Sequence, residues 1–454
     1  MSAVAETQAG GTIFSLPGRL KVLAEILGAQ GRTADANRIY QQAADVIEAI
    51  MLNVPSREAQ ARLIGARSDV YEGHFRLAAS NLRDPARAYE VIEKARGRAV
   101  ADVLRTLPAE GPNTTYVDDE AFRAISRLQI RLMRAQSPTE RQQLLEQLWE
   151  AEQRARVRGP STPVTRVTAG NPVPIRTLQQ HLAAGEVILQ YVLTEPHSYC
   201  LFISRNQLRL VQLPSRRHIE PLVDLFVAAL REGTGANQNL ADDIHRAVLG
   251  PISGWQQAER LFIVPDGKLH LLPLDIVMTR NDGPGRIVAT VPSANVLYLL
   301  RTRQPVTMPN RPLFAMGGVP YDRMFVGKPA PSSQSRSDET RGFFDAGFPS
   351  NLPNLATARV EVLTAAKLLG EGSLALTGEE ATETRLKRED LRRFGIVHFA
   401  AHAFADPKFP ERAAIVLLND PANDEDGLLQ PREIGQLRLN AGAVVLSALS
   451  LIHI

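Results

Sequence analysis

The chain has 454 residues, of which 44% are hydrophobic and 22% charged, and its formal net charge at pH 7 is +3. This length exceeds what one ordinary core supports, so two or three domains are expected. The small net charge argues against a nucleic-acid partner, and no apolar run approaches the about 18 residues of a membrane-spanning helix. A single cysteine, Cys200, excludes an internal disulfide and favours a reducing compartment, the cytoplasm.

Residues 1–112 are predicted to form helical repeats. Two apolar stripes at helical spacing flank Gly31, and the second contains Ala36, Tyr40 and Ala43. This small, aromatic, small pattern resembles the second helix of a tetratricopeptide hairpin. A similar spacing recurs in a helix for which Asp84 is the expected N-cap residue and Pro85 the first helical residue. An ordinary helical bundle is the alternative interpretation.

Residues 113–165 are predicted to be a helical segment followed by a linker. The helical part, about residues 118–156, is rich in Arg, Gln, Glu and Leu, and its charged positions indicate a solvated helix face. Gly and Pro between residues 159 and 174 break the helical pattern. We therefore place a domain boundary near residue 165.

Residues 166–454 are predicted to form an α/β domain. Apolar runs typical of strands alternate with helical patterns, which favours a mainly parallel sheet covered by helices on both faces. The first three runs, between residues 187 and 213, are separated by short polar turns and indicate a meander. The later candidate strands are residues 261–264, 286–291, 313–316, 396–399, 414–418 and 443–446.

Two of these runs are of the kind that is buried on both faces, residues 396–403 and 444–448. The first contains His402, and histidine is suited to general-base work near neutral pH. If the two strands are parallel neighbours, their ends lie roughly 5 Å apart on one edge of the sheet. His402 and residue 449 would then converge.

Several short motifs follow one another along the chain. They are Val264-Pro265-Asp266-Gly267 followed by Leu272-Pro273, then Val291-Pro292-Ser293, residues 378–382, residues 398–402, and Asp426-Gly427-Leu428-Leu429. In this order they resemble the CHAT family of caspase-like cysteine peptidases, and the resemblance extends from about residue 175 to 448. The resemblance implies a caspase-like α/β/α sandwich, incomplete at the C-terminus, preceded by an all-α tetratricopeptide-like region.

The resemblance further implies that His402 is the catalytic general base and that the nucleophilic cysteine follows Ala448. Leu449 occupies that position, and Ala403 replaces the glycine that usually follows the histidine. A cysteine at 449 would act as a thiolate beside an imidazolium and attack a peptide carbonyl. Without it the chain is predicted to be inactive, because losing a nucleophile costs on the order of 10⁶ in rate.

Other candidate residues have simpler roles. Strand alternation points His398 into the layer between sheet and helix, so we expect a core histidine. Cys200 lies in an apolar strand and is expected to be a buried, inert thiol. Ser447 is expected to be a packed hydroxyl. Neither a metal site nor a cofactor site is predicted, since His398 and His402 have no further ligand at suitable spacing.

Residues 449–454 have the sequence expected if a transposon-end adapter, used to prepare sequencing libraries, were translated in frame. We therefore expect the chain to be a fragment of a longer protein. As it stands, strand 443–448 would be an exposed apolar edge that promotes aggregation.

The leading functional hypothesis is a CHAT-type cysteine endopeptidase regulated through its helical repeats, which would bind a protein substrate or regulatory protein. The alternative is a non-catalytic interaction scaffold with a caspase-like docking module. The residue at position 449 of the natural protein distinguishes the two hypotheses.

Overall fold

The structure is a computed structural model that divides the chain into two compact units. Unit 1 combines Met1–Leu107 with Thr162–Gln304, and unit 2 combines Pro108–Ser161 with Pro305–Ile454. Each unit therefore draws on two separate stretches, a division different from the sequence-based boundaries near residues 112 and 165. The structure describes residues 13–51, 54, 57–106, 120–135, 137–158, 171–232, 238–278, 286–303, 309–324, 352–404 and 412–447.

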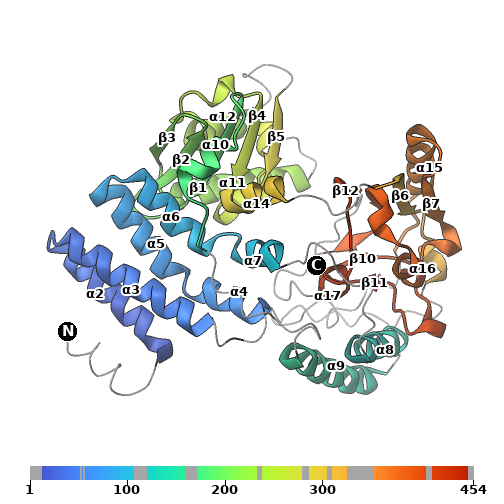
Figure 1. Ribbon diagram of the computed structural model, residues 1–454. Coiled ribbons are helices and arrows are strands. Elements are labelled where there is room, and N and C mark those ends of the chain that lie inside the picture. The colour runs from blue at the N-terminus through green and yellow to red at the C-terminus, as the bar shows by residue number, and fades with distance from the viewer. Residues whose placement is uncertain are drawn as a thin grey trace. The chain divides into compact units, whose positions relative to one another are not determined.

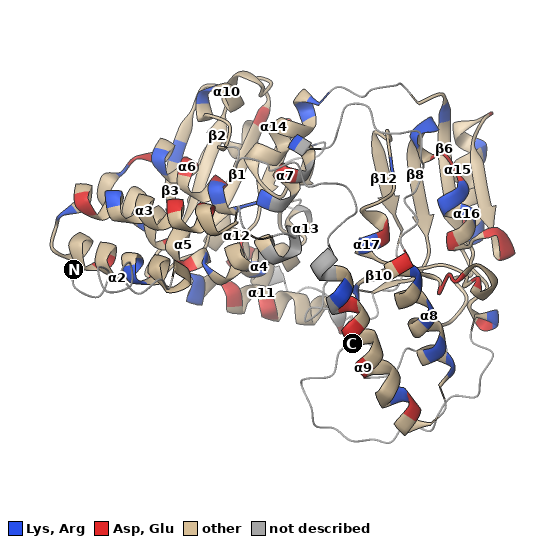
Figure 2. Cartoon of the chain, turned by 60° about the horizontal axis from the view of Figure 1, so that its bottom comes forward, with Lys and Arg blue, Asp and Glu red and all other residues tan. Residues whose placement is uncertain are grey.

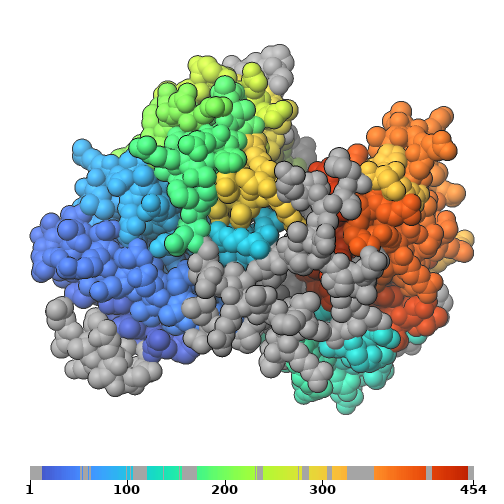
Figure 3. Space-filling model, viewed as in Figure 1, coloured from blue at the N-terminus to red at the C-terminus, as the bar shows by residue number. Residues whose placement is uncertain are grey.

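The described N-terminal part of unit 1 consists of helices and short turns, and α2 and α3 form part of its outer surface (Figure 3). Gly31, with a φ of 77°, makes the turn between α2 and α3, and Ala36 and Ala43 are fully buried between helices. The helical hairpin predicted here is present, whereas its assignment as a tetratricopeptide repeat stays a prediction. The helices are α2 (Leu16–Ala29), α3 (Thr33–Met51), α4 (Arg57–Ala66), α5 (Ser68–Arg76), α6 (Pro85–Ala95) and α7 (Arg98–Thr106).

Helix α6 joins the helical part of unit 1 to its sheet. The Asp84 side chain accepts hydrogen bonds from the amides of Ala86 and Arg87, which confirms the predicted N-cap. Further along α6, the buried Glu93 carboxylate accepts hydrogen bonds from Gln190 Nε2 and from the amide of Asn295, both at 2.7 Å. These bonds tie the helix to a strand and to the start of another helix of the same unit.

Unit 1 contains a five-stranded sheet in the order β3-β2-β1-β4-β5, with α/β packing (Figure 1). Strands β1, β4 and β5 are parallel, and β2 and β3 are antiparallel additions. Helices α11 and α12 share an apolar core with one face, and α6, α10 and α14 with the other. The strands are β1 (Glu186–Val192), β2 (Ser198–Ser204), β3 (Leu208–Leu213), β4 (Arg260–Val264) and β5 (Ile287–Thr290); the helices are α10 (Ile175–Gln180), α11 (Arg216–Arg231), α12 (Gln238–Val248), α13 (Leu274–Met278) and α14 (Ala294–Thr302).

Unit 2 contains a four-stranded parallel sheet in the order β12-β8-β6-β7. Helix α15 packs on one face, and the other face shares a core with α8, α9 and a small antiparallel sheet, β11-β10-β9. The strands are β6 (Arg311–Gly317), β7 (Leu374–Thr377), β8 (Phe394–Ala400), β9 (Ala403–Phe404), β10 (Ala414–Val416), β11 (Leu428–Leu429) and β12 (Ala443–Leu446); the helices are α8 (Glu120–Arg134), α9 (Pro138–Arg158), α15 (Ala358–Leu369), α16 (Glu383–Arg388) and α17 (Pro431–Ile434).

The α/β fold class predicted from the sequence is confirmed, but its strands do not form one sheet. Those before residue 304 belong to the sheet of unit 1, and those after it to the sheets of unit 2. Helices α8 and α9, predicted to precede a linker, belong to unit 2. The buried Arg412 guanidinium pairs with Glu152 of α9 at 3.0 Å, which fixes α9 beside strand β10.

The second apolar run is not buried on both faces, and it is instead the exposed apolar edge expected of the chain as it stands. Strand β8 is mostly buried, but β12 lies at the edge of its sheet, and Val444, Val445 and Leu446 are 48%, 43% and 61% exposed. Among the described residues, β12 pairs with β8 alone. An edge strand leaves a row of backbone N–H and C=O groups without a neighbouring strand, and in β12 apolar side chains are exposed as well. The aggregation expected of this edge stays a prediction.

None of the helices in the described ranges has both the length and the apolar content to cross a membrane. Acidic and basic residues are interspersed on the helices in the view of Figure 2. This pattern agrees with the small net charge of the whole chain.

Candidate functional site

The backbone of His402 is held at both of its polar groups. His402 follows β8 and precedes β9, and its amide donates a hydrogen bond to the Tyr321 hydroxyl at 2.8 Å. Its carbonyl accepts one from the amide of Val416 in β10, also at 2.8 Å. The Tyr321 hydroxyl in turn donates to the Val416 carbonyl at 3.0 Å. These three bonds fix the position of the residue between two sheets.

The imidazole of His402 is oriented by a backbone carbonyl. Its Nε2 lies 2.8 Å from the carbonyl oxygen of Pro353. Because a carbonyl only accepts, Nε2 must carry the proton, and the neutral ring then has its free lone pair on Nδ1. The ring also packs on Tyr321, with 4.7 Å between the ring centroids.

The Nδ1 atom is buried and has no hydrogen-bond partner within the described part of the chain. The whole residue is only 1% exposed. A buried polar atom without a partner costs about 1–3 kcal/mol, and a role in the chemistry of the site is one explanation for such an atom. The arrangement therefore presents an oriented, unsatisfied base.

Strands β8 and β12 are parallel neighbours, as predicted. Their register pairs Phe399 with Leu446, and the Ser447 amide donates to the Phe399 carbonyl at 2.8 Å. In the sequence, His402 comes three residues after Phe399, and Leu449 comes three residues after Leu446. Position 449 itself lies outside the described residues, so the predicted meeting of His402 and residue 449 stays a prediction.

The two histidines of the motif have different surroundings. His398 faces α15, where its Nε2 lies 2.9 Å from Glu361 Oε1, and it is 7% exposed. It is the paired core histidine expected from strand alternation. His402 lies past the end of β8, where its ring contacts Tyr321 and Pro353 instead.

The other sulfur and hydroxyl candidates, Cys200 and Ser447, differ in their burial. Cys200 lies in β2 of unit 1 and is fully buried, and burial raises the pKa of its thiol well above the ordinary value. It is therefore an inert, protonated thiol at neutral pH, as expected. Ser447 is half-buried at the end of β12, less enclosed than its apolar context predicts.

Sequence analysis did not identify Tyr321 or Pro353 as site residues. They lie 81 and 49 positions before His402, and one of the two contacts uses a backbone atom, which no residue-type pattern reveals. Tyr321 did carry a signal, because it closely follows β6, and polar groups beyond parallel strand ends gather at one edge.

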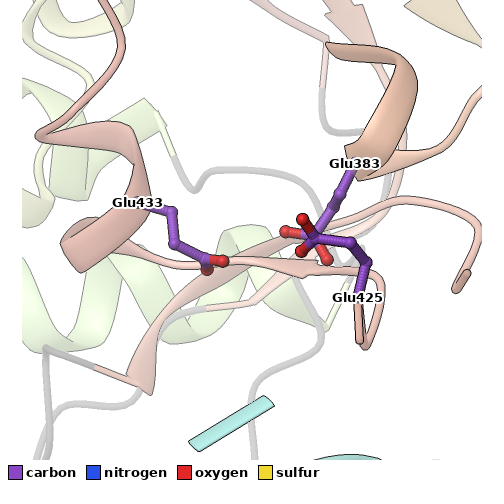
Figure 4. Close-up of side chains that lie close together, drawn as sticks. All are labelled: Glu383, Glu425 and Glu433. Carbon is purple, nitrogen blue, oxygen red and sulfur yellow. The ribbon is translucent and has the colours of Figure 1, made fainter. Parts of the chain in front are cut away.

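A second group of ionisable residues lies in unit 2. Glu383, Glu425 and Glu433 come from three separate segments, and their carboxyl groups point toward one another (Figure 4). Three carboxylates can bind a cation, but here Lys387 Nζ lies 2.6 Å from Glu425, 2.8 Å from Glu433 and 3.6 Å from Glu383. The lysine ammonium supplies the positive charge that these carboxylates require.

Comparison with known families identifies the C-terminal part of the chain. Residues 238–450 match the family model of the CHAT domain. The chain contains a CHAT domain. The match begins at α12 in unit 1 and includes both His402 and position 449. No curated protein matches the sequence.

The CHAT domain relates the chain to caspase-like peptidases and confirms the resemblance seen in its motifs. The match begins at residue 238, later than the motif-based estimate near residue 175. Strands β1 to β3 thus lie outside the matched range, although they share a sheet with β4 and β5 of the CHAT domain.

Proposed function

We propose that this CHAT domain is organised for cysteine-peptidase chemistry, with His402 as general base, and that the chain with Leu449 does not cleave peptides. The observation that carries the proposal is the buried Nδ1 of His402, which has no hydrogen-bond partner among the described residues and whose ring is oriented through Nε2 by the Pro353 carbonyl. The parallel pairing of β8 with β12 supports the approach of residue 449 to this nitrogen.

In the proposed reaction, a cysteine thiol at position 449 transfers its proton to Nδ1. The thiolate attacks the peptide carbonyl, and the carbon–nitrogen bond breaks as the imidazolium returns the proton to the leaving amine. Water then hydrolyses the thioester, with His402 again accepting a proton. The leucine at 449 has no ionisable group and cannot begin this sequence.

The proposal is tested by the thiol reactivity of Leu449→Cys in a Cys200→Ala background, so that the introduced cysteine is the only one in the chain. At pH 6 we expect iodoacetamide to alkylate this thiol about tenfold faster than the same thiol in a variant that also carries His402→Ala, because the imidazolium stabilises the thiolate. Equal rates in the two proteins would refute the role of His402.

The rival scaffold function predicts a different result. A docking module needs no activated thiol, so the cysteine introduced at position 449 would react at the rate of an ordinary cysteine, whose pKa is about 8.5. The alkylation rate would then be low at pH 6, rise about tenfold with each pH unit and level off only above about pH 8.5. A rate that is already high at pH 6 and falls on removal of the imidazole supports the peptidase.

We further propose that the helical region binds a protein partner or substrate in the cytoplasm and thereby regulates the CHAT domain. Val22 and Ile26, one helical turn apart on α2, are 53% and 50% exposed and form an apolar strip available to a partner. A protein that co-purifies with the native chain should not co-purify with the double variant that carries both Val22→Glu and Ile26→Glu. Retention of that partner would refute the proposed surface.

A further inference from the structure

We infer that Asp322 and Asn354 form a clasp that positions the imidazole of His402. The inference rests on the proposed function of His402 and adds two positioning residues to it. Asn354 Nδ2 donates a hydrogen bond to Asp322 Oδ1 at 3.0 Å, and the Asp322 amide donates to Asn354 Oδ1 at 3.3 Å. The two residues thus bind each other reciprocally across 32 positions of sequence.

Each residue of the clasp directly follows a residue that contacts His402. Tyr321 precedes Asp322, and its hydroxyl accepts a hydrogen bond from the His402 amide. Pro353 precedes Asn354, and its carbonyl accepts the Nε2 proton. The contacts therefore close a ring from His402 through Tyr321 and the clasp to Pro353 and back to His402.

The Pro353 carbonyl needs such support because it lies outside regular structure. Residues 352–355 belong to neither a helix nor a strand, and Pro353 itself is exposed. On one side of Pro353 the segment is anchored by Leu352, which is 3% exposed in the core. On the other side, the side chain of Asn354 provides the second anchor. Two flanking anchors fix the direction of the carbonyl between them.

Loss of the clasp would therefore speed the exchange of the His402 Nε2 proton with water. With one anchor removed, the Pro353 carbonyl spends part of the time turned away from the ring, and the Nε2 proton becomes open to exchange with water. The ring also loses the contact that fixes its tautomer, so that Nδ1 is no longer always the free base. The clasp acts on His402 through Tyr321 and Pro353, so Asp322 and Asn354 are positioning residues.

The test is the exchange rate of the His402 Nε2 proton, measured by NMR on the full chain with isotope-labelled histidine and assigned with His402→Gln. In Asn354→Ala we expect this exchange to be about fivefold faster than in the native chain, as for the loss of one ordinary hydrogen bond. Asn354→Asp should be at least as fast, because it places a second carboxylate against Asp322.

Two further variants separate positioning from damage to the fold. Combining Asp322→Asn with Asn354→Asp reverses the donor and acceptor side chains and keeps both bonds, so it should restore slow exchange. Arg323→Ala is the matched control, since it removes an exposed ion pair to Glu379 at 2.7 Å from the same turn without touching the clasp. It should leave the exchange rate unchanged.

The outcomes distinguish the clasp from the proposed function. Native exchange rates in Asn354→Ala, or a failure of the reversed pair to restore slow exchange, would overturn the clasp whatever the thiol chemistry shows. Conversely, faster exchange in Asn354→Ala that the reversed pair corrects supports the clasp, even if the thiol of the Leu449→Cys protein proves unreactive and the peptidase proposal fails.

Discussion

The Nε2 atom of His402 donates a hydrogen bond to the carbonyl oxygen of Pro353, 2.8 Å away. The orienting group is thus a neutral backbone oxygen instead of a carboxylate. A carbonyl selects the tautomer with Nδ1 free, but it stabilises an imidazolium less than a full negative charge would. Because the carbonyl has no net charge, its effect on the imidazole depends on its position. The contacts of Leu352 and Asn354 hold that position.

Tyr321→Phe tests the support of the His402 backbone. Tyr321 is 2% exposed, and its hydroxyl bonds both the His402 amide and the Val416 carbonyl. Removing it leaves two buried backbone groups unsatisfied, so the free energy of unfolding of unit 2 should fall by about 2–3 kcal/mol. Urea denaturation measures the loss. A change below about 0.5 kcal/mol would show that these bonds do not hold the site.

Protonation of His74 should destabilise the helical part of unit 1 in acid. His74 stacks on Tyr40, shares a hydrogen bond with Asn37 and is 2% exposed. Its burial, and to a smaller extent repulsion from Arg87 and Lys94, lowers its pKa to about 3. Because the folded pKa lies below the unfolded value of about 6.5, the unfolded chain holds the proton more tightly.

This contribution to stability is complete above about pH 6.5 and is lost progressively as the pH falls toward 3. Between pH 7 and pH 4.5 the loss should be about 2–3 kcal/mol. His74→Gln can still bond Asn37 but does not titrate, so its urea midpoint should fall less over the same interval. Parallel losses in both proteins would contradict the assignment to His74.

Lys387 should be essential to the glutamate cluster, and Glu383 should be dispensable. Lys387→Met leaves buried carboxylates facing one another without their cation, so unit 2 should lose about 3–5 kcal/mol at pH 8. Glu383→Gln keeps an acceptor for the Gly427 amide and removes one buried charge. We expect it to be neutral or stabilising at pH 8.

The pH dependence of the Glu383→Gln effect has a definite sign. Burial, with repulsion from Glu433, raises the pKa of Glu383 well above its usual range, and burial raises the pKa of Asp426 to about 7. The folded state therefore prefers the protonated acid, and the cost of ionising Glu383 grows as the pH rises. The relative stability of Glu383→Gln, measured by urea denaturation, should increase from pH 5 to pH 8. A decrease would contradict the burial of this charge.

Periodicity predicted the strand context of the site, whereas the roles of His402 and position 449 stay predictions. Alternation along residues 396–399 assigned His398 to the helix-covered face, and the two apolar runs were expected to be parallel neighbours. The structure shows both features. These predictions depend on local pattern and on the tendency of parallel strands to place functional residues at one edge.

Features that depend on distant contacts were not predicted. The Pro353 carbonyl has no residue-type signature, and the ion pair between Glu152 and Arg412 joins segments 260 positions apart. The separation of the strands into two main sheets depends on which strands become neighbours. A list of apolar runs does not contain this information.

The account depends most directly on the proximity of residues 402 and 449, which a disulfide trap can measure. A disulfide forms only when the two Cα atoms are about 4.4–6.8 Å apart. We compare two double-cysteine proteins, both in a Cys200→Ala background. The first combines His402→Cys and Leu449→Cys, and the second combines His398→Cys and Leu449→Cys. In the second pair, residue 398 is in register with Val445, so position 449 lies four residues further along, about 13 Å away if the chain stays extended.

Mild oxidation followed by peptide mass spectrometry should find most of the 402–449 pair cross-linked and little of the 398–449 pair. That result would place the imidazole of His402 beside the nucleophile position, as the peptidase proposal requires. Absence of the 402–449 disulfide, or equal cross-linking of both pairs, would contradict it.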